Sequence, residues 1–154
     1  MMDGKTGGIV NAMAVASEME KRGIALYKRA ARIVSDDRLR GLLLRLLDEE
    51  NSHLRYFESL RGDTPGEDEI GGSLSAALAA DAFIPGGLMQ MAGEGAFESM
   101  ERMLDAAIQA ENDSIDYYGK MLENASGEVR NQLEEVLSQE RGHLSELNGW
   151  RYGE

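Results

Sequence analysis

Cysteine is absent from the 154-residue chain, and only two prolines occur in it. Without a thiol the protein has no disulfide, no thiolate nucleophile, and no Cys-ligated zinc ion or iron–sulfur cluster. Aromatic residues are scarce as well, at 6% of the chain. Few prolines and few aromatic residues favour helices over a sheet.

Basic residues are also in short supply, because 16 Lys and Arg face 28 Asp and Glu and leave a formal charge of −12. An excess this acidic argues against nucleic acid and anionic membrane surfaces as partners. No apolar run approaches the roughly 20 residues of a membrane span. Residues 9–16 end in an Ala-x-Ala pattern, but Asp3 cancels Lys5, so the basic leader of a signal peptide is missing. We therefore expect a cytoplasmic protein.

The rest of the composition is that of a globular chain, with 42% hydrophobic and 29% charged residues. The length fits a single domain over residues 1–154. Apolar residues recur at helical spacing in four segments, and in the third they include Met100 and Leu104. The four segments are residues 9–34, 38–60, 97–124 and 128–150.

The connections between these segments differ in length. Short turns at residues 35–37 and 124–127 make two helical hairpins, residues 9–61 and 97–150. Residues 62–96 hold both prolines and many glycines, and a connection this long usually either spans a distance or has a function of its own. The pattern predicts an all-α protein, a four-helix bundle in up-down-down-up order with a long crossover between the second and third helices.

In each of the four helical segments the apolar residues form a stripe along one face, which we call the inner stripe. Each inner stripe contains a glutamate, and two of the stripes also contain the only histidines of the chain. These residues are Glu20, Glu50, His53, Glu111, Glu140 and His143. A lone ionised carboxylate in a core costs several kcal/mol or more, so four in one bundle need a common counter-charge. Lys and Arg fall mainly on the outer faces and do not supply it.

The spacing indicates where the four glutamates meet. The midpoint between Glu20 and Glu50 falls in the first turn, and that between Glu111 and Glu140 falls in the second. Folding each pair as a hairpin therefore places its glutamates at equal height. The hairpins also repeat each other, because each starts with Glu followed by Tyr seven residues later and ends in Glu-x-x-His-Leu. We interpret this as an internal duplication.

Glu and His three residues apart lie on one helical face, so both can bind one metal ion. Imidazole with carboxylates suits iron or manganese, with zinc as a substitute, and four carboxylates balance two divalent cations. Tyr27 and Tyr118 are either core aromatics or donors of hydrogen bonds to ligand carboxylates. The other glutamates near the stripes are interpreted as solvated or as partners of the ligands. They are Glu18, Glu49, Glu134 and Glu135.

With these motifs, both hairpins resemble the ferritin-like di-iron carboxylate superfamily, and most closely the rubrerythrin-type di-iron domain. The resemblance implies two iron ions, with Glu20 and Glu111 as terminal ligands and one histidine for each metal. It implies Glu50 and Glu140 as bridging ligands. It also implies reduction of peroxide or O2 in oxidative-stress defence, and a homodimer.

Two departures from rubrerythrins matter. Without Cys there is no rubredoxin domain, so the electrons have to come from an external donor such as a rubredoxin or a flavoprotein. The further carboxylate that the family carries one turn along the third helix is missing, because Ser114 and Ile115 stand there. The expected function is a di-iron oxidoreductase. The alternatives are an iron-binding, ferroxidase or storage protein, and a structural metal that holds the bundle together.

Overall fold

The computed structural model describes residues 4–62 and 95–153, and this part holds four α-helices and no strand. The helices are α1 (Gly4–Ile33), α2 (Asp37–Gly62), α5 (Met100–Glu123) and α6 (Gly127–Tyr152). The prediction of an all-α four-helix bundle is confirmed. The expected crossover, residues 62–96, lies almost wholly outside the described residues.

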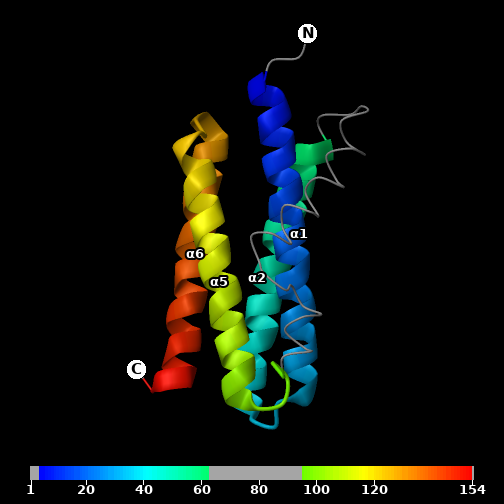
Figure 1. Cartoon of the computed structure of the whole chain (residues 1–154), viewed down its shortest axis with the longest axis vertical. Coiled ribbons are helices and arrows are strands. Elements are labelled where there is room, and N and C mark those ends of the chain that lie inside the picture. The colour runs from blue at the N-terminus through cyan, green and yellow to red at the C-terminus, as the bar shows by residue number, and fades with distance from the viewer. Residues whose placement is uncertain (1–3, 63–94, 154) are drawn as a thin grey trace.

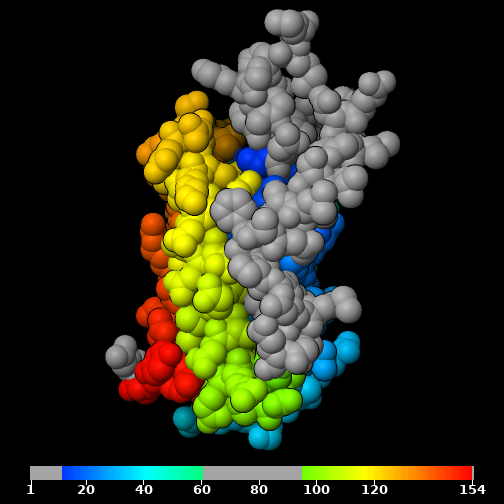
Figure 2. All heavy atoms as spheres, viewed as in Figure 1, coloured from blue at the N-terminus to red at the C-terminus, as the bar shows by residue number. Residues whose placement is uncertain are grey.

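The helices pair as two antiparallel hairpins that lie side by side (Figure 1). Helix α1 packs along α2, α5 packs along α6, and the hairpins meet where α1 contacts α5 and α2 contacts α6. In Figure 1, α2 and α5 begin at the same end of the bundle, and α5 covers much of the face seen in Figure 2.

The turn between α1 and α2 is closed by side chains at both helix ends. Asp36 Oδ1 accepts hydrogen bonds from the backbone N–H groups of Arg38 and Leu39 at 2.8 and 3.1 Å, which caps α2. Arg40 donates to the carbonyls of Ala31, at 2.9 Å, and Val34, which lie at the C-terminal end of α1. The short turn predicted at residues 35–37 is therefore present, and Asp36 supplies its helix cap.

The turn between α5 and α6 is also closed by an arginine that donates to a carbonyl at the end of the preceding helix. Arg130 Nη1 donates to the carbonyl of Leu122 at 2.8 Å, as Arg40 does to the end of α1. Both arginines lie ten residues before the glutamate of the Glu-x-x-His motif. The duplication thus extends to the way in which the two hairpins are closed.

At the start of α5 the sequence-based prediction was wrong by three residues. The third helical segment was expected from Phe97, but Ser99 is the N-cap, and its side chain accepts from the Arg102 N–H at 3.1 Å. Met100, expected on the inner stripe, is 42% exposed, because it lies in the first turn at the end of the bundle. Met103, which is fully buried, packs in the core instead.

Two apolar layers fill the bundle, one at each end. The first, which includes Leu43 and Leu104, lies toward the α1–α2 turn. The second, which includes Phe57 and Leu137, lies toward the α5–α6 turn. Between them the chain places polar side chains, so the core is interrupted halfway along the bundle. None of the helices in residues 4–62 and 95–153 is long and apolar enough to cross a membrane.

Candidate metal centre

The polar layer contains all six residues that the sequence analysis selected as metal ligands. Each helix contributes: α1 one glutamate, α5 one glutamate, and α2 and α6 a glutamate and a histidine each. None of the six is more than 3% exposed. They are Glu20, Glu50, His53, Glu111, Glu140 and His143.

These side chains form two overlapping groups in which one ligand atom from each residue lies within 4.8 Å of the others. We call the group of Glu20, Glu50, His53 and Glu140 the first position. We call the group of Glu50, Glu111, Glu140 and His143 the second position. Both positions contain Glu50 and Glu140. The residues at either position could hold a metal ion.

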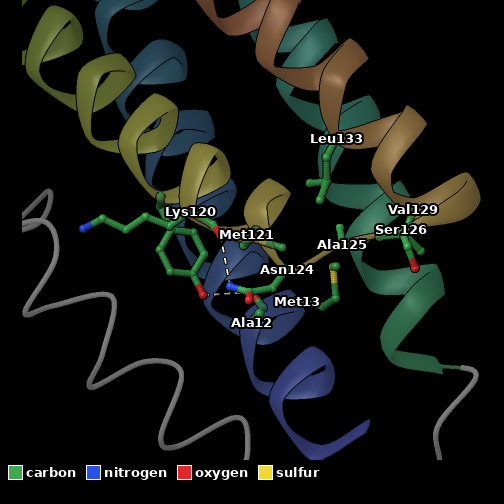
Figure 3. Close-up of a pocket in the computed structure, with 10 residues that line it drawn as sticks. Ala12, Met13, Lys120, Met121, Asn124, Ala125, Ser126, Val129 and Leu133 are labelled. Carbon is green, nitrogen blue, oxygen red and sulfur yellow. Dashed lines mark hydrogen bonds between the residues drawn. The ribbon is translucent and has the colours of Figure 1, made fainter. Parts of the chain in front are cut away.

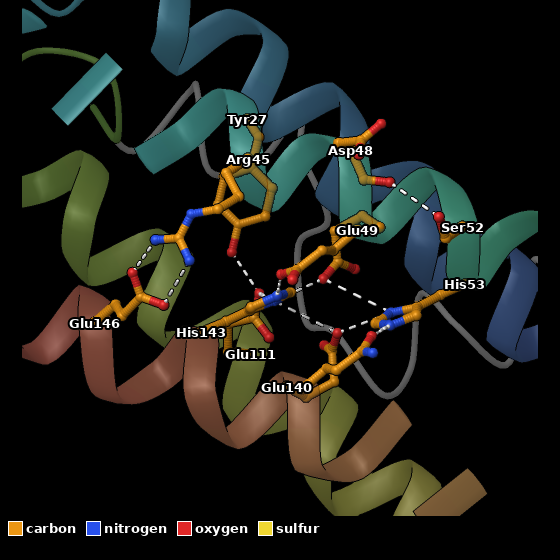
Figure 4. Close-up of polar contacts among 12 residues, drawn as sticks. Tyr27, Arg45, Asp48, Glu49, Ser52, His53, Glu111, Glu140, His143 and Glu146 are labelled. Atoms are coloured by element: carbon orange, nitrogen blue, oxygen red, sulfur yellow. Dashed lines mark hydrogen bonds and ion pairs between the residues drawn. The ribbon is translucent and has the colours of Figure 1, made fainter. Parts of the chain in front are cut away.

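The histidines face the carboxylates with the same ring nitrogen (Figure 4). His53 Nδ1 lies 3.1 Å from Glu140 Oε1 and 3.5 Å from Glu20 Oε1. His143 Nδ1 lies 3.0 Å from Glu50 Oε1 and 3.5 Å from Glu111 Oε1. The two imidazole rings are stacked with their centroids 6.3 Å apart, so the nitrogens and the carboxylates converge on a small volume.

Several of these converging atoms have no hydrogen-bond partner. They are Glu20 Oε2, Glu50 Oε1, His53 Nδ1, Glu111 Oε2, both carboxylate oxygens of Glu140, and His143 Nδ1. Buried polar atoms are almost always paired, so a cluster of orphaned ones needs an explanation. Orphaned oxygens and imidazole nitrogens, all turned toward one place, are a donor set that could hold a metal ion.

Two buried tyrosines orient the carboxylates of Glu20 and Glu111, each from the opposite hairpin. The Tyr27 hydroxyl donates to Glu111 Oε1, and the Tyr118 hydroxyl donates to Glu20 Oε1 at 2.7 Å. Burial and then the nearby carboxylates raise the pKa of both phenols well above the usual value, so they remain donors. Of the two roles left open for these tyrosines, the structure favours the hydrogen-bonding one.

The second ring nitrogen of each histidine is held as well, also from across the bundle. His53 Nε2 lies 2.5 Å from Gln139 Oε1, and His143 Nε2 lies beside Glu49 Oε2. Glu49 was one of several glutamates that the sequence left between a solvated and a supporting role. Gln139 was missed. The sequence does indicate its role, because Gln139 precedes Glu140 just as Glu49 precedes Glu50 in the other repeat.

The remaining candidates lie away from the centre. Glu134 and Glu135 are exposed, and Glu134 pairs with Arg130 at 3.3 Å. Glu18 is half-buried and pairs with Lys21 at 3.5 Å. These two ion pairs with basic side chains lie outside the two ligand groups, so none of the three glutamates contributes to the centre.

Burial controls the ionisation of the carboxyl groups. Desolvation raises the pKa of both Glu50 and Glu140 well above the ordinary value, and the neighbouring carboxylates raise it further. Burial would raise the pKa of Glu111 too, but His143 and Tyr27 beside it outweigh burial and hold that pKa below its usual value. The two glutamates common to both positions are therefore the ones that most need a positive charge nearby.

Burial acts on the pKa of the two histidines in the opposite direction. Burial disfavours a charged imidazole, but Glu140 and Glu20 outweigh that effect and raise the pKa of His53 to about 11. In the same way Glu111 and Glu140 outweigh burial and raise the pKa of His143 to about 9. The centre thus attracts positive charge strongly. No Lys or Arg side chain is buried within residues 12–60 and 95–153, so within that part of the chain the imidazoles are the buried basic groups.

A separate cavity of about 590 Å³ lies at the end of the bundle near the α5–α6 turn, between α1, α5 and α6 (Figure 3). Its lining is mainly apolar and includes Met13, Met121 and Leu133. Tyr117, which also lines it, donates a hydrogen bond from its hydroxyl to the Ala12 carbonyl at 3.3 Å. None of the lining residues belongs to the first or the second position.

The fold and the site together define an all-α four-helix protein with a buried carboxylate–histidine centre that could hold metal ions. Compared with known proteins, the chain matches no family model, no curated protein and no solved structure.

Proposed function

We propose that the protein is a non-haem di-iron oxidoreductase of the rubrerythrin-like type, which reduces peroxide or O2 with electrons from an external donor. The proposal includes the ferritin-like arrangement of the bundle, in up-down-down-up order with a long crossover. It rests on the residues of the metal centre and on the duplication of the hairpins.

The observation that carries the proposal is that two ligand groups share two buried carboxylates, Glu50 and Glu140. A carboxylate has two oxygens and can bind two cations at once, and two-metal centres hold their ions about 3.5–4 Å apart in this manner. One histidine is left for each position, as is one terminal glutamate, Glu20 or Glu111. A pair of ferrous ions held by these residues would supply one electron each, and these two electrons suffice to reduce peroxide to water or O2 to peroxide.

The protein's own residues orient the ligands and exclude water. Tyr27 and Tyr118 fix one oxygen of each terminal carboxylate and leave the other, Oε2, without a partner and free to bind. Gln139 and Glu49 hold the imidazoles with Nδ1 turned inward. The apolar layers on either side keep the centre dry, which strengthens every electrostatic interaction within it.

The missing cysteines bear on the source of electrons. With no thiol among these 154 residues, they contain no Cys-ligated iron centre that could pass electrons to this site. A rubredoxin or a flavoprotein remains the proposed donor, and a homodimer remains the proposed assembly. Ser114 and Ile115 offer no carboxylate one turn beyond Glu111, so the proposed chemistry uses the six ligands alone.

The test is a metal analysis of protein purified without added metal, combined with the optical spectrum before and after addition of peroxide. We expect two iron ions per chain and a change in absorption that reverses when the donor is supplied. Iron that oxidises once and accumulates beyond two ions per chain would favour the storage alternative. Bound metal that does not respond to peroxide or O2 would favour a structural metal.

A further inference from the structure

The two metal positions are built from matched residues, with one exception. Each has its terminal glutamate, its histidine and its tyrosine hydrogen bond from the opposite hairpin. The exception is the residue before each shared glutamate, which is Glu49 in α2 and Gln139 in α6. The duplication therefore places a carboxylate and an amide at equivalent points.

Both of these side chains contact a ligand histidine. Gln139 Oε1 lies 2.5 Å from His53 Nε2. Glu49 Oε2 lies beside His143 Nε2 (Figure 4). Nδ1 of each ring is the nitrogen among the carboxylates, so when Nδ1 binds a metal ion the ring proton is on Nε2, which then donates its N–H. His53 thus donates to a neutral amide, whereas His143 donates to a carboxylate.

The acceptor changes the strength of the imidazole as a ligand. A carboxylate that accepts the outer N–H raises the basicity of the metal-binding nitrogen and fixes the ring, and the hydrogen bond itself is stronger than one to a neutral group. Glu49 also places a negative charge beside the second position, whereas the equivalent residue beside the first position is neutral. Arg45, one turn earlier on α2, is engaged by Glu146 through both Nη atoms.

We propose that Glu49 and Gln139 make the two metal positions unequal, so that the second position, around His143, binds a divalent cation more tightly and fills first. This inference rests on the proposed two-metal centre and names the residues that set its order of filling. Glu49 and Gln139 are positioning residues, since they act through the histidines and lie outside both ligand groups.

The experiment uses metal-free full-length protein titrated with Mn²⁺ alone in the absence of oxygen, with the free ion counted by its EPR signal. We expect the native chain to bind two Mn²⁺ ions in two steps of different affinity. In Glu49→Gln, which keeps the size and the acceptor, the tighter step should weaken by about tenfold, the lower end of the range for partners of ligand histidines. The two steps should then converge.

The exchange variant separates this role from a merely structural one. Glu49→Gln combined with Gln139→Glu restores one carboxylate and one amide, so two unequal steps should reappear. Two further sets of variants show which binding step belongs to which metal position. With His53→Ala as background, Glu49→Gln should weaken the remaining ion about tenfold. With His143→Ala as background, where Glu49 has lost its imidazole partner, the same change should alter the affinity by less than twofold.

Two equal steps in the native chain would overturn the inference and leave the two-metal centre intact. So would two unequal steps that Glu49→Gln does not change. Failure of the native chain to bind any Mn²⁺ would overturn both the inference and the metal centre. Two unequal steps in a protein whose iron form does not react with peroxide or O2 would overturn the proposed function alone.

Discussion

The two hairpins of this protein carry the same chemistry, yet neither forms a metal position by itself. The first position takes Glu20, Glu50 and His53 from the α1–α2 hairpin but needs Glu140 from the other. The second position takes its other three residues from the α5–α6 hairpin but needs Glu50 from the α1–α2 hairpin. Duplication of a hairpin has thus produced two half-sites that become complete only when they face each other.

The supporting contacts cross in the same manner. Tyr27 of the first hairpin holds Glu111 of the second, and Tyr118 holds Glu20. Gln139 and Glu49 likewise contact the histidine of the opposite hairpin. Packing between the hairpins and the capacity to hold metal therefore depend on each other, because each hairpin supplies contacts that orient the candidate ligands of the other.

The largest effect should follow loss of a shared carboxylate. Glu50→Ala and Glu140→Ala each remove a ligand from both positions, so we expect metal content to fall from two ions per chain toward none. Oxidation of ferrous iron should be lost with it, while the apolar layers keep the helices folded. The measurements are metal per chain, the rate of ferrous oxidation and far-UV circular dichroism.

Glu18→Ala is the matched control for these variants. Glu18 lies on α1 near Glu20 but pairs with Lys21 away from the centre. It should keep both metals and full activity. Two metals per chain together with unchanged oxidation in Glu50→Ala and Glu140→Ala would contradict the shared role of these carboxylates.

Loss of one histidine should have about half of that effect on metal content. His53→Ala removes a ligand from the first position only, and His143→Ala from the second only. We expect close to one tightly bound ion per chain in each variant and loss of two-electron turnover in both. Metal titration followed by peroxide consumption checks this. A variant that loses both ions, or neither, would show that the positions are not separate.

Removing the metal should make stability fall as the pH rises. Below its unfolded-state pKa a group with a raised folded-state pKa stabilises the fold fully, and this contribution is lost as pH climbs through the folded-state value. His53 and His143, with pKa values raised to about 11 and about 9, lose it between roughly pH 6.5 and 11. The raised pKa values of Glu50 and Glu140 act in the same direction.

Denaturant unfolding of chelator-treated protein at pH 6, 7.5 and 9 measures this effect. The midpoint should decrease at each step, whereas metal-loaded protein should change less, because bound metal replaces the protons. Metal at a hundred times its dissociation constant adds about 2.7 kcal/mol to the free energy of unfolding for each site. A midpoint that rises with pH in the metal-free protein would contradict the assigned pKa directions.

The smallest effect should come from the tyrosines that cross between the hairpins. Tyr27→Phe and Tyr118→Phe each leave a buried carboxylate oxygen without its donor, which costs about 1–3 kcal/mol. We expect a lower melting temperature and weaker binding of one metal ion in each variant, with both ions still bound at saturation. Tyr152→Phe is the control, because that ring is 60% exposed, and it should match the native protein. Equal melting temperatures for the native protein and all three variants would show that these tyrosine hydroxyls do not stabilise the fold.

Much of this arrangement could be predicted from the sequence, because it depends on periodicity. Glu20 and Glu111 interrupt apolar stripes, and a charged residue on a buried stripe is visible without a structure. The duplication gave the two hairpins a common register, and the short turns fixed the height of the ligands. The helices and the six converging side chains follow from these local patterns.

The supporting residues depended on the angle at which the helices pack, which periodicity does not encode. Glu49 and Gln139 lie beside the inner stripe and are half-buried, so the pattern left Glu49 open and passed over Gln139. Met100 has the spacing of a core residue but lies where the bundle ends, and nothing in the pattern of apolar residues marks that end. Neighbours in the sequence were predictable; partners across the bundle were not.

The most direct test of the central claim, that six residues build one two-metal centre, is anomalous diffraction at the iron edge from crystals of iron-loaded protein. We expect two peaks about 3.5–4 Å apart, both bound by Glu50 and Glu140, with His53 on one and His143 on the other. A single peak, or two peaks that share neither glutamate, would contradict it.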